Sequence, residues 1–129
     1  MTRITAEPLK RVGTIGLGTS RSAVRETASL PYKEFKKTPL SSNTTDDFGA
    51  FHVYYDDDDR CEAVEFFDDV EVEVDGKLVF PTSSEEARRA IPSLTQDGDG
   101  LISVEESIGI YAPGGTMESI LFGVKGYYE

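Results

Sequence analysis

Two stretches decide the fold predicted from this sequence: FHVYYDDDDRCEAVEF at residues 51–66 and SIGIYAPGGTMESILF at residues 107–122. At an offset of 56 residues they share a tyrosine, a glutamate and a phenylalanine, at Tyr55/Tyr111, Glu62/Glu118 and Phe66/Phe122. Each stretch has two apolar-rich runs around a polar or glycine-rich turn, which predicts a β-hairpin. A short amphipathic stretch that begins with Ser or Thr precedes each hairpin. The sequence therefore predicts one small unit of helix and hairpin used twice.

Local signals place the other elements. A Ser/Thr N-cap predicts a helix over residues 20–29, and the capping-box pattern of Ser83 and Glu86 predicts a second over residues 84–91. Alternating valine and glutamate at residues 70–74 predicts a strand. The remaining expectations are an irregular lead-in at residues 1–10, a strand at 11–17, a surface loop at 32–47, a tight Asp75-Gly76 turn into a strand at 77–80, and a loop at 95–100.

These elements predict an α+β fold, with an antiparallel sheet and two short helices on one of its faces. The 129 residues are expected to form a single domain, with half-repeats at residues 11–80 and 81–129. The strands at residues 51–80 are expected to form a four-stranded meander. Phe66, Phe67 and the last strand are expected at an exposed apolar edge, where the protein would be a monomer or pair as a homodimer.

Composition limits the class of protein. No apolar run approaches the 18 residues of a membrane span, and the basic N-terminus is not followed by the apolar run of a signal peptide. The single cysteine excludes a disulfide framework and fits a reducing compartment, so we expect a cytoplasmic protein.

Charge indicates the kind of partner. The net charge is −11, and residues 46–75 alone carry 13 acidic side chains and 1 basic one. Such a segment repels nucleic acid and anionic lipid and attracts a basic protein. The predicted contact residues for a basic partner are Asp56, Asp57, Asp58, Asp59, Asp68 and Asp69. The alternative interpretation is a solvated acidic surface that keeps the chain in solution.

Residues 95–106, TQDGDGLISVEE, resemble the calcium-binding loop of the EF-hand family. Asp97, Asp99, Ser103 and Glu106 match ligand positions of that loop, and the resemblance implies that they bind calcium. Thr95 stands where the family has its first aspartate, and the segment after the loop is predicted to be a strand instead of a helix. The alternative is an Asp-Gly turn that leads into a strand.

His52 and Cys61 are the only histidine and the only cysteine. If the hairpin turns at Asp57-Asp58, Tyr54 lies opposite Cys61, and His52 lies diagonal to Cys61 on the same face. A cysteine beside a histidine is the minimum for a thiol nucleophile, so a small enzyme with a site at His52, Cys61 and Tyr54 is a further hypothesis.

A helix opened by Gly18-Thr19-Ser20, with Val24 on its apolar side, precedes the hairpin at residues 51–67 and its counterpart at 107–123. This order resembles the tandem-repeat architecture of β-lactamase inhibitor proteins and of the related lipoproteins of outer-membrane assembly. The resemblance implies a sheet whose outer face can serve as a binding platform. The inhibitor family is secreted and disulfide-bonded, whereas this chain has one cysteine, so no inhibitory residue is carried over.

The leading hypothesis is a small acidic module that binds a protein without catalysis, of the immunity or inhibitor type. Its expected partner is a basic protein and not nucleic acid or a membrane, and no cofactor is expected. The alternatives are a calcium-binding protein and the His/Cys enzyme.

Overall fold

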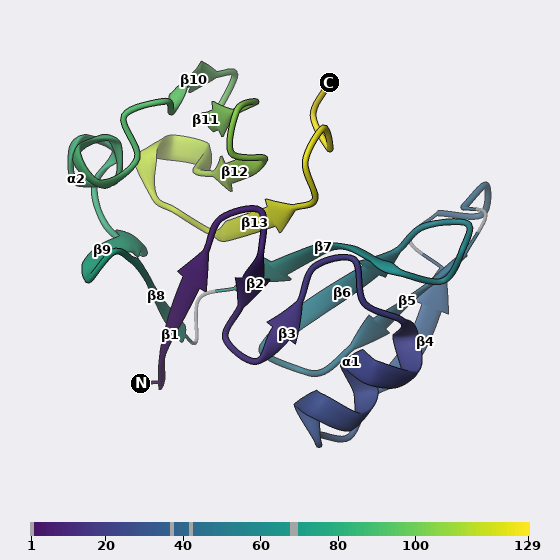
Figure 1. Cartoon of the computed structure of the whole chain (residues 1–129). Helices are drawn as coiled ribbons and strands as arrows, with labels where there is room; N and C mark the ends of the chain where they lie inside the picture. The colour runs from purple at the N-terminus through teal and green to yellow at the C-terminus, as the bar shows by residue number, and fades with distance from the viewer. Residues whose placement is uncertain (1, 37, 42, 68–69) are drawn as a thin grey trace.

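The computed structural model describes residues 2–36, 38–41, 43–67 and 70–129. These residues form two α-helices and 13 strands in two sheets, one of eight strands and one of five (Figure 1). The fold therefore mixes helices with antiparallel-rich sheets, as expected, but it has two sheets where one was predicted.

The eight-stranded sheet has the order β10-β11-β12-β13-β7-β6-β5-β4 and is antiparallel throughout. Each half of it is a run of four consecutive strands that follows a helix in the chain. The first half contains α1 (Arg21–Ala28), β4 (Lys33–Lys36), β5 (Thr44–Asp47), β6 (Phe51–Tyr55) and β7 (Cys61–Phe66). The second half contains α2 (Ser84–Ala90), β10 (Thr95–Asp97), β11 (Gly100–Ser103), β12 (Ile108–Tyr111) and β13 (Ser119–Gly123).

The two halves meet where β7 pairs with β13. Phe66 lies opposite Ile120, and Val64 lies opposite Phe122. The expected exposed edge at Phe66 and the last strand is therefore wrong, because these two strands pair with each other in the middle of the sheet and Phe66 is buried.

The five-stranded sheet has the order β3-β2-β1-β8-β9. Its strands are β1 (Thr2–Glu7), β2 (Arg11–Val12), β3 (Ile15–Gly16), β8 (Val70–Val74) and β9 (Lys77–Phe80). The irregular lead-in expected at residues 1–10 is wrong, because β1 forms a parallel pair with β8. The residues of β1 by themselves did not predict a strand. The predicted four-stranded meander is also wrong, since β8 and β9 leave the sheet of β6 and β7.

The expected surface loop at residues 32–47 contains β4 and β5, and the expected loop at 95–100 contains β10 and the start of β11. Both edge strands are short and polar, so their pairing depends on the neighbouring strand instead of on an apolar pattern. The helix predictions are confirmed: Ser20 and Ser83 cap α1 and α2 by accepting hydrogen bonds from the backbone N–H groups of Ala23 and Glu86. Neither helix in the described part of the chain is long and apolar enough to span a membrane.

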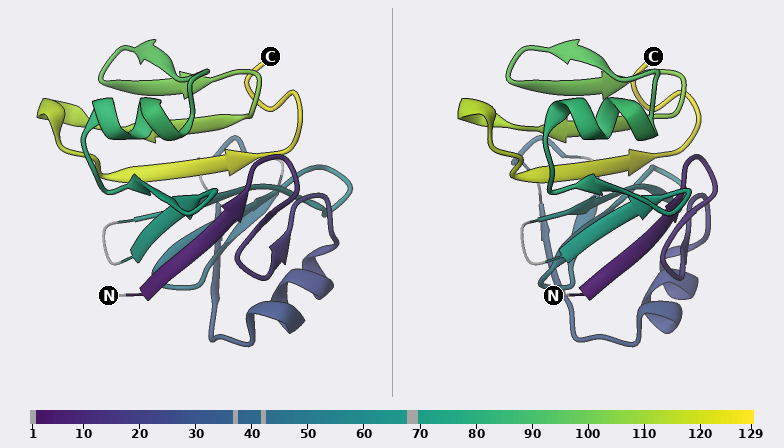
Figure 2. Two further views of the ribbon diagram at one scale, coloured as in Figure 1. Left: turned by 60° about the vertical axis from the view of Figure 1, so that its left-hand side comes forward. Right: turned by 90° about the vertical axis from the view of Figure 1, so that its left-hand side faces the viewer.

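The inner face of the eight-stranded sheet carries the main core. Alternate residues of its central strands, such as Phe51, Val53, Ile110 and Ile120, pack in one cluster with residues of the five-stranded sheet and of both helices. Figure 2 shows β10–β13 together at one end of the molecule and α1 at the other. Along these strands, the residues that alternate with the core residues point to the opposite, outer face of the sheet. There Tyr54, Ala63 and Leu121 form a second, small cluster.

The register of the two hairpins differs by one residue from the sequence alignment. Tyr54 pairs with Ala63 in the first hairpin, and Tyr111 pairs with Ser119 in the second. Because Ala63 and Ser119 are 56 residues apart, Tyr111 occupies the place of Tyr54 and not that of Tyr55. An irregularity of the ladder between Tyr54 and Tyr55 accounts for the extra residue.

Candidate functional site

The four aspartates predicted to contact a partner form the turn between β6 and β7. The carboxylate of Asp56 accepts hydrogen bonds from the backbone N–H groups of Asp58, at 2.9 Å, and Arg60, at 3.0 Å. Asp56 therefore shapes the turn, while Asp57 and Asp58 are exposed on it. The other two predicted contacts, Asp68 and Asp69, lie outside the described residues.

Asp59 is held by residues of the first half. Its carboxylate accepts hydrogen bonds from the amide of Asn43, at 3.0 Å, and from the guanidinium of Arg21, at 2.9 Å. These two bonds, that of Asn43 first, lower the pKa of Asp59 below its usual value. The side chain of Asp59 is still about half exposed, so it can contact a partner while it remains paired with Arg21.

Arg21 belongs to a buried network that fastens α1 to β5. The carboxylate of Asp46 is fully buried and accepts hydrogen bonds from Arg21 at 3.2 Å, from Arg25 at 2.8 Å and from the hydroxyl of Tyr55 at 2.8 Å. The guanidinium of Arg21 also lies over the ring of Tyr55, 4.0 Å from its centre. This network stabilises the fold, and it leaves both arginines occupied within the molecule.

The predicted calcium loop is a β-hairpin. Asp97 ends β10 and Asp99 follows it in the turn, while Ser103 is buried in β11 and bonds through its hydroxyl to Ser93 and to the N–H of Glu106. Asp97 and Asp99 thus lie before the start of β11, whereas Ser103 ends this strand and Glu106 follows it. In the described part of the chain, no three His, Cys, Asp or Glu side chains gather closely enough to hold a metal ion.

The predicted pairing of His52 and Cys61 is wrong. Cys61 lies opposite Tyr55 instead of Tyr54 and packs in the main core, whereas His52 lies opposite Glu65 on the outer face. The cause is the irregular register after Tyr54, because a shift of one residue moves a side chain to the other face. Burial raises the pKa of the Cys61 thiol to about 12, so little of the nucleophilic thiolate forms at neutral pH.

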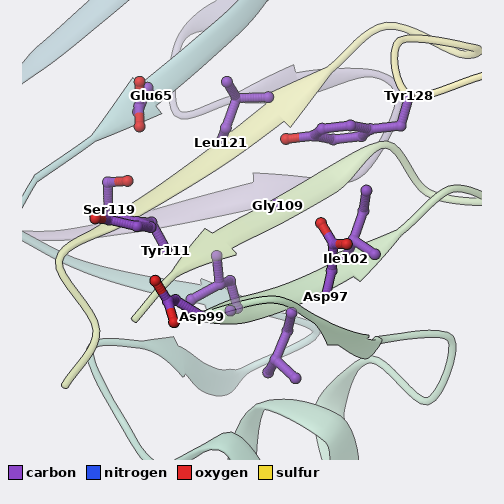
Figure 3. Close-up of a pocket in the computed structure, with 12 residues that line it drawn as sticks. Glu65, Asp97, Asp99, Ile102, Gly109, Tyr111, Ser119, Leu121 and Tyr128 are labelled. Atoms are coloured by element: carbon purple, nitrogen blue, oxygen red, sulfur yellow. The ribbon is translucent and has the colours of Figure 1, made fainter. Parts of the chain in front are cut away.

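The outer face of the second half contains a groove that no motif in the sequence predicted. It has a volume of about 270 Å³ and is lined by carboxylates, tyrosine rings and a leucine: Glu65, Asp97, Asp99, Tyr111, Leu121 and Tyr128 (Figure 3). We call it the outer-face groove. None of the described residues that line it is basic. Two predicted calcium ligands, Asp97 and Asp99, thus line this groove, and Figure 3 shows their carboxylates at separate places along it.

Two glycines seat the C-terminal tyrosines on the sheet. A Cβ atom on Gly109 would lie 2.1 Å from the hydroxyl oxygen of Tyr128, and one on Gly123 would lie 2.6 Å from the ring of Tyr127. The tyrosines therefore lie directly on the strand backbones, where any larger residue would displace them. In Figure 3 the phenol of Tyr128 extends across β12 at Gly109 and forms a wall of the outer-face groove.

Burial raises the pKa of two tyrosines on the outer face, Tyr54 and Tyr128. The hydroxyl of Tyr54 donates to the carboxylate of Glu65 at 2.5 Å, and burial together with this bond raises the pKa of Tyr54. Burial also raises the pKa of Tyr128. No described residue accepts a hydrogen bond from the Tyr128 hydroxyl, which leaves that group available to a ligand.

An aromatic surface extends from the groove to the other end of the same face. The ring of His52 meets Phe35 edge-on at 5.2 Å and Phe67 at 4.8 Å, and Phe35 is exposed. Asp47 lies beside this group, 3.5 Å from the imidazole. Aromatic side chains are enriched at protein-binding surfaces, where their rings supply contact area.

Comparison of the chain with protein-family models, with curated proteins and with solved structures found no match in any of the three. Sequence reasoning missed the outer-face groove because its residues come from five separate segments. The one local signal was glycine within predicted strands, at Gly109 and Gly123, which marks a place where another part of the chain comes close.

Proposed function

We propose that this protein is a non-catalytic binding module of the immunity or inhibitor type, and that it binds a basic protein through the outer face of its eight-stranded sheet. We also propose that the two halves of that sheet are copies of one unit, as in the tandem-repeat inhibitors that the sequence resembles.

The observation that carries the proposal is an exposed face rich in aromatic and acidic side chains. The inner face packs against a second sheet and two helices, whereas the outer cluster of Tyr54, Ala63 and Leu121 has Tyr127 and Tyr128 as its partly buried apolar neighbours in the described chain. Around this buried cluster the same face exposes Phe35 and Tyr111, and exposed apolar surface is typical of a protein-binding site.

Charge supports a basic partner. The protein has a net charge of −11, and the outer-face groove is lined by three carboxylates and no basic residue among those described. A surface of one sign speeds the encounter with a partner of the opposite sign and rejects partners of its own sign. Asp57 and Asp58, on the β6–β7 turn, add to the same field.

The geometry favours binding over catalysis. Cys61 and His52 lie on opposite faces, and the thiol is buried. The described lining of the outer-face groove contains no His, Cys or Lys side chain.

Selection from a random peptide display library tests the proposal without a known partner. We expect the selected peptides to be enriched in Lys and Arg and to bind more weakly as salt is raised. Reversing two charges of the outer face, in Asp97→Lys/Asp99→Lys, should weaken their binding about tenfold. The matched control, Glu26→Lys/Glu85→Lys, reverses two exposed carboxylates on the helices, which pack on the inner face, and should have a smaller effect. Peptides without basic enrichment, or an equal loss in both variants, would overturn the proposal.

A further inference from the structure

We infer that the outer-face groove binds the side chain of an arginine from the basic partner, with its guanidinium between the carboxylates of Asp97 and Asp99 and the ring of Tyr111. This inference rests on the proposed function and names the group on the partner that the site recognises.

The size of the groove suits a single side chain. Its volume of about 270 Å³ lies below the range of about 300–1,000 Å³ that is usual for sites of drug-sized ligands. The floor is made of strand backbone and apolar side chains, because Gly109 and Leu121 lie opposite each other on β12 and β13. Such a floor suits the methylene stem of a long cationic side chain, whose charged end remains at the rim.

The rim of the groove carries two carboxylates that make no side-chain hydrogen bond or ion pair with other described residues. Neither Asp97 nor Asp99 has a side-chain ion pair or hydrogen bond among the described residues. Other acids of the described chain do pair with arginines, as Glu71 and Glu73 pair with Arg3. The two free carboxylates therefore complement a cation brought by another molecule.

The aromatic walls select a planar cation. The ring of Tyr111 is about half exposed at the groove, and the hydroxyl of Tyr128 points across it. A guanidinium stacks on a tyrosine ring and donates several hydrogen bonds in its plane, which an ammonium does not.

The same chain already recognises arginine in this way. The guanidinium of Arg21 lies 4.0 Å from the centre of the Tyr55 ring while its N–H groups bond the carboxylates of Asp46 and Asp59. Arg25 likewise lies 4.1 Å from the centre of the Tyr32 ring and bonds Asp46. A tyrosine ring with two carboxylates at its edge is thus a working arginine site in the first half, and Tyr111, Asp97 and Asp99 offer the same groups in the second.

A titration with small analogues tests the inference on the intact protein. The probes are Nα-acetyl-arginine methylamide, its lysine counterpart and its citrulline counterpart, which has the shape of arginine without the charge. In ¹H–¹⁵N spectra we expect the arginine probe to shift the amide signals of Gly109, Tyr111, Leu121 and Tyr128 in a saturable manner. The lysine probe should bind more weakly, and the citrulline probe should leave these signals unchanged.

Neutral variants locate the binding. Asp97→Asn/Asp99→Asn should weaken the arginine probe about tenfold, at roughly threefold for each carboxylate removed. Tyr111→Leu, which keeps an apolar side chain at an exposed position, should also weaken it, whereas Glu26→Gln/Glu85→Gln removes the same charge from the two helices and should not. The unchanged spectrum outside the groove serves to show that each variant is folded.

Shifts confined to the β6–β7 turn, shifts spread over all acidic surfaces, or an equal response to citrulline would overturn the inference. If selected basic peptides bind the outer face but the arginine probe does not enter the groove, the inference fails and the proposed function stands. If the probe enters the groove and no basic peptide is selected, the proposed function fails alone.

Discussion

The hydroxyl oxygen of Tyr128 occupies the space that a Cβ atom on Gly109 would need, at a distance of 2.1 Å. This contact joins the C-terminal segment to the middle of β12 and forms one wall of the outer-face groove. The end of the chain is therefore part of the binding surface that we propose.

Two glycine substitutions should differ in their effect on stability, because one glycine faces a side chain in the wall of the groove and the other faces strand backbone. Gly109→Ala meets the far end of a side chain that can swing away, so we expect a small change in the free energy of unfolding, below about 1 kcal/mol, and a displaced Tyr128. In Gly100→Ala the new Cβ would lie 1.9 Å from the carbonyl oxygen of Ile110, which is backbone, and the loss should reach about 3 kcal/mol. Urea denaturation measures both, and equal losses would contradict the contact geometry.

The buried carboxylate of Asp46 should be the most sensitive polar position of the first half. Asp46→Ala leaves Arg21 and Arg25 without their shared acceptor, and we expect a loss of about 3–5 kcal/mol in the free energy of unfolding. Tyr55→Phe removes one hydrogen bond to the same carboxylate and should cost about 1.5–3 kcal/mol. Glu34→Gln, which changes an exposed partner of Arg25, is the control and should have little effect in the same urea titration.

Two neighbouring aspartates of the β6–β7 turn should differ in their effect on stability. Asp59→Asn weakens the contacts to Asn43 and Arg21 and should lower the free energy of unfolding by about 0.5 kcal/mol, while Asp58→Asn should not. The pKa of Asp59 is lowered in the folded protein, so its contribution is present above its ordinary pKa of 3.8 and is lost as the pH falls through the folded value. Unfolding at pH 7 and at pH 3 checks this, because the difference between the two variants should be smaller at the lower pH.

Glu106 should show the opposite dependence on pH. Burial, with the charges of Glu105 and Asp75, raises the pKa of Glu106 above its ordinary 4.5. A raised pKa means that the folded state holds the proton more tightly, so stability is lost as the pH rises through the folded pKa. Glu106→Gln should therefore raise the melting temperature at pH 7 and have a much smaller effect at pH 4. Glu118→Gln, which removes a carboxylate from an exposed position, is the control.

The thiol of Cys61 should be unreactive in the folded protein. It is fully buried and its pKa is raised to about 12, so little thiolate forms at neutral pH. We expect Ellman's reagent to label Cys61 at pH 8 only after unfolding in urea. Rapid labelling without urea would contradict its place in the core and would revive the enzyme hypothesis.

Local structure could be predicted from the sequence because it depends on residues close together in the chain. The caps at Ser20 and Ser83 act over three residues, and the Asp75-Gly76 turn joins β8 to β9 as expected. The hairpin of β6 and β7 and that of β12 and β13 also follow from alternation around a turn.

The sequence could not predict which face of the sheet each side chain of those hairpins occupies. Successive side chains of a strand point to opposite faces, so a shift of one residue in register exchanges the two faces. The irregularity after Tyr54 sends Cys61 into the core and leaves His52 outside, although both lie in a hairpin that was predicted correctly. The same limit applies to the groove, since the sequence pointed to Asp97 and Asp99 as calcium ligands and gave no sign of Tyr128 beside them.

The sequence by itself determined the two helices, the tight turns, the central hairpins and the strongly acidic charge, because each depends on composition or on neighbours within a few residues. Only the tertiary structure decided that β1 pairs with β8, that Asp46 is a buried partner of two arginines, and that Tyr128 closes a groove over Gly109. These relationships join residues far apart in the chain. Their free energy comes from burial and pairing that exist only once the sheets have formed.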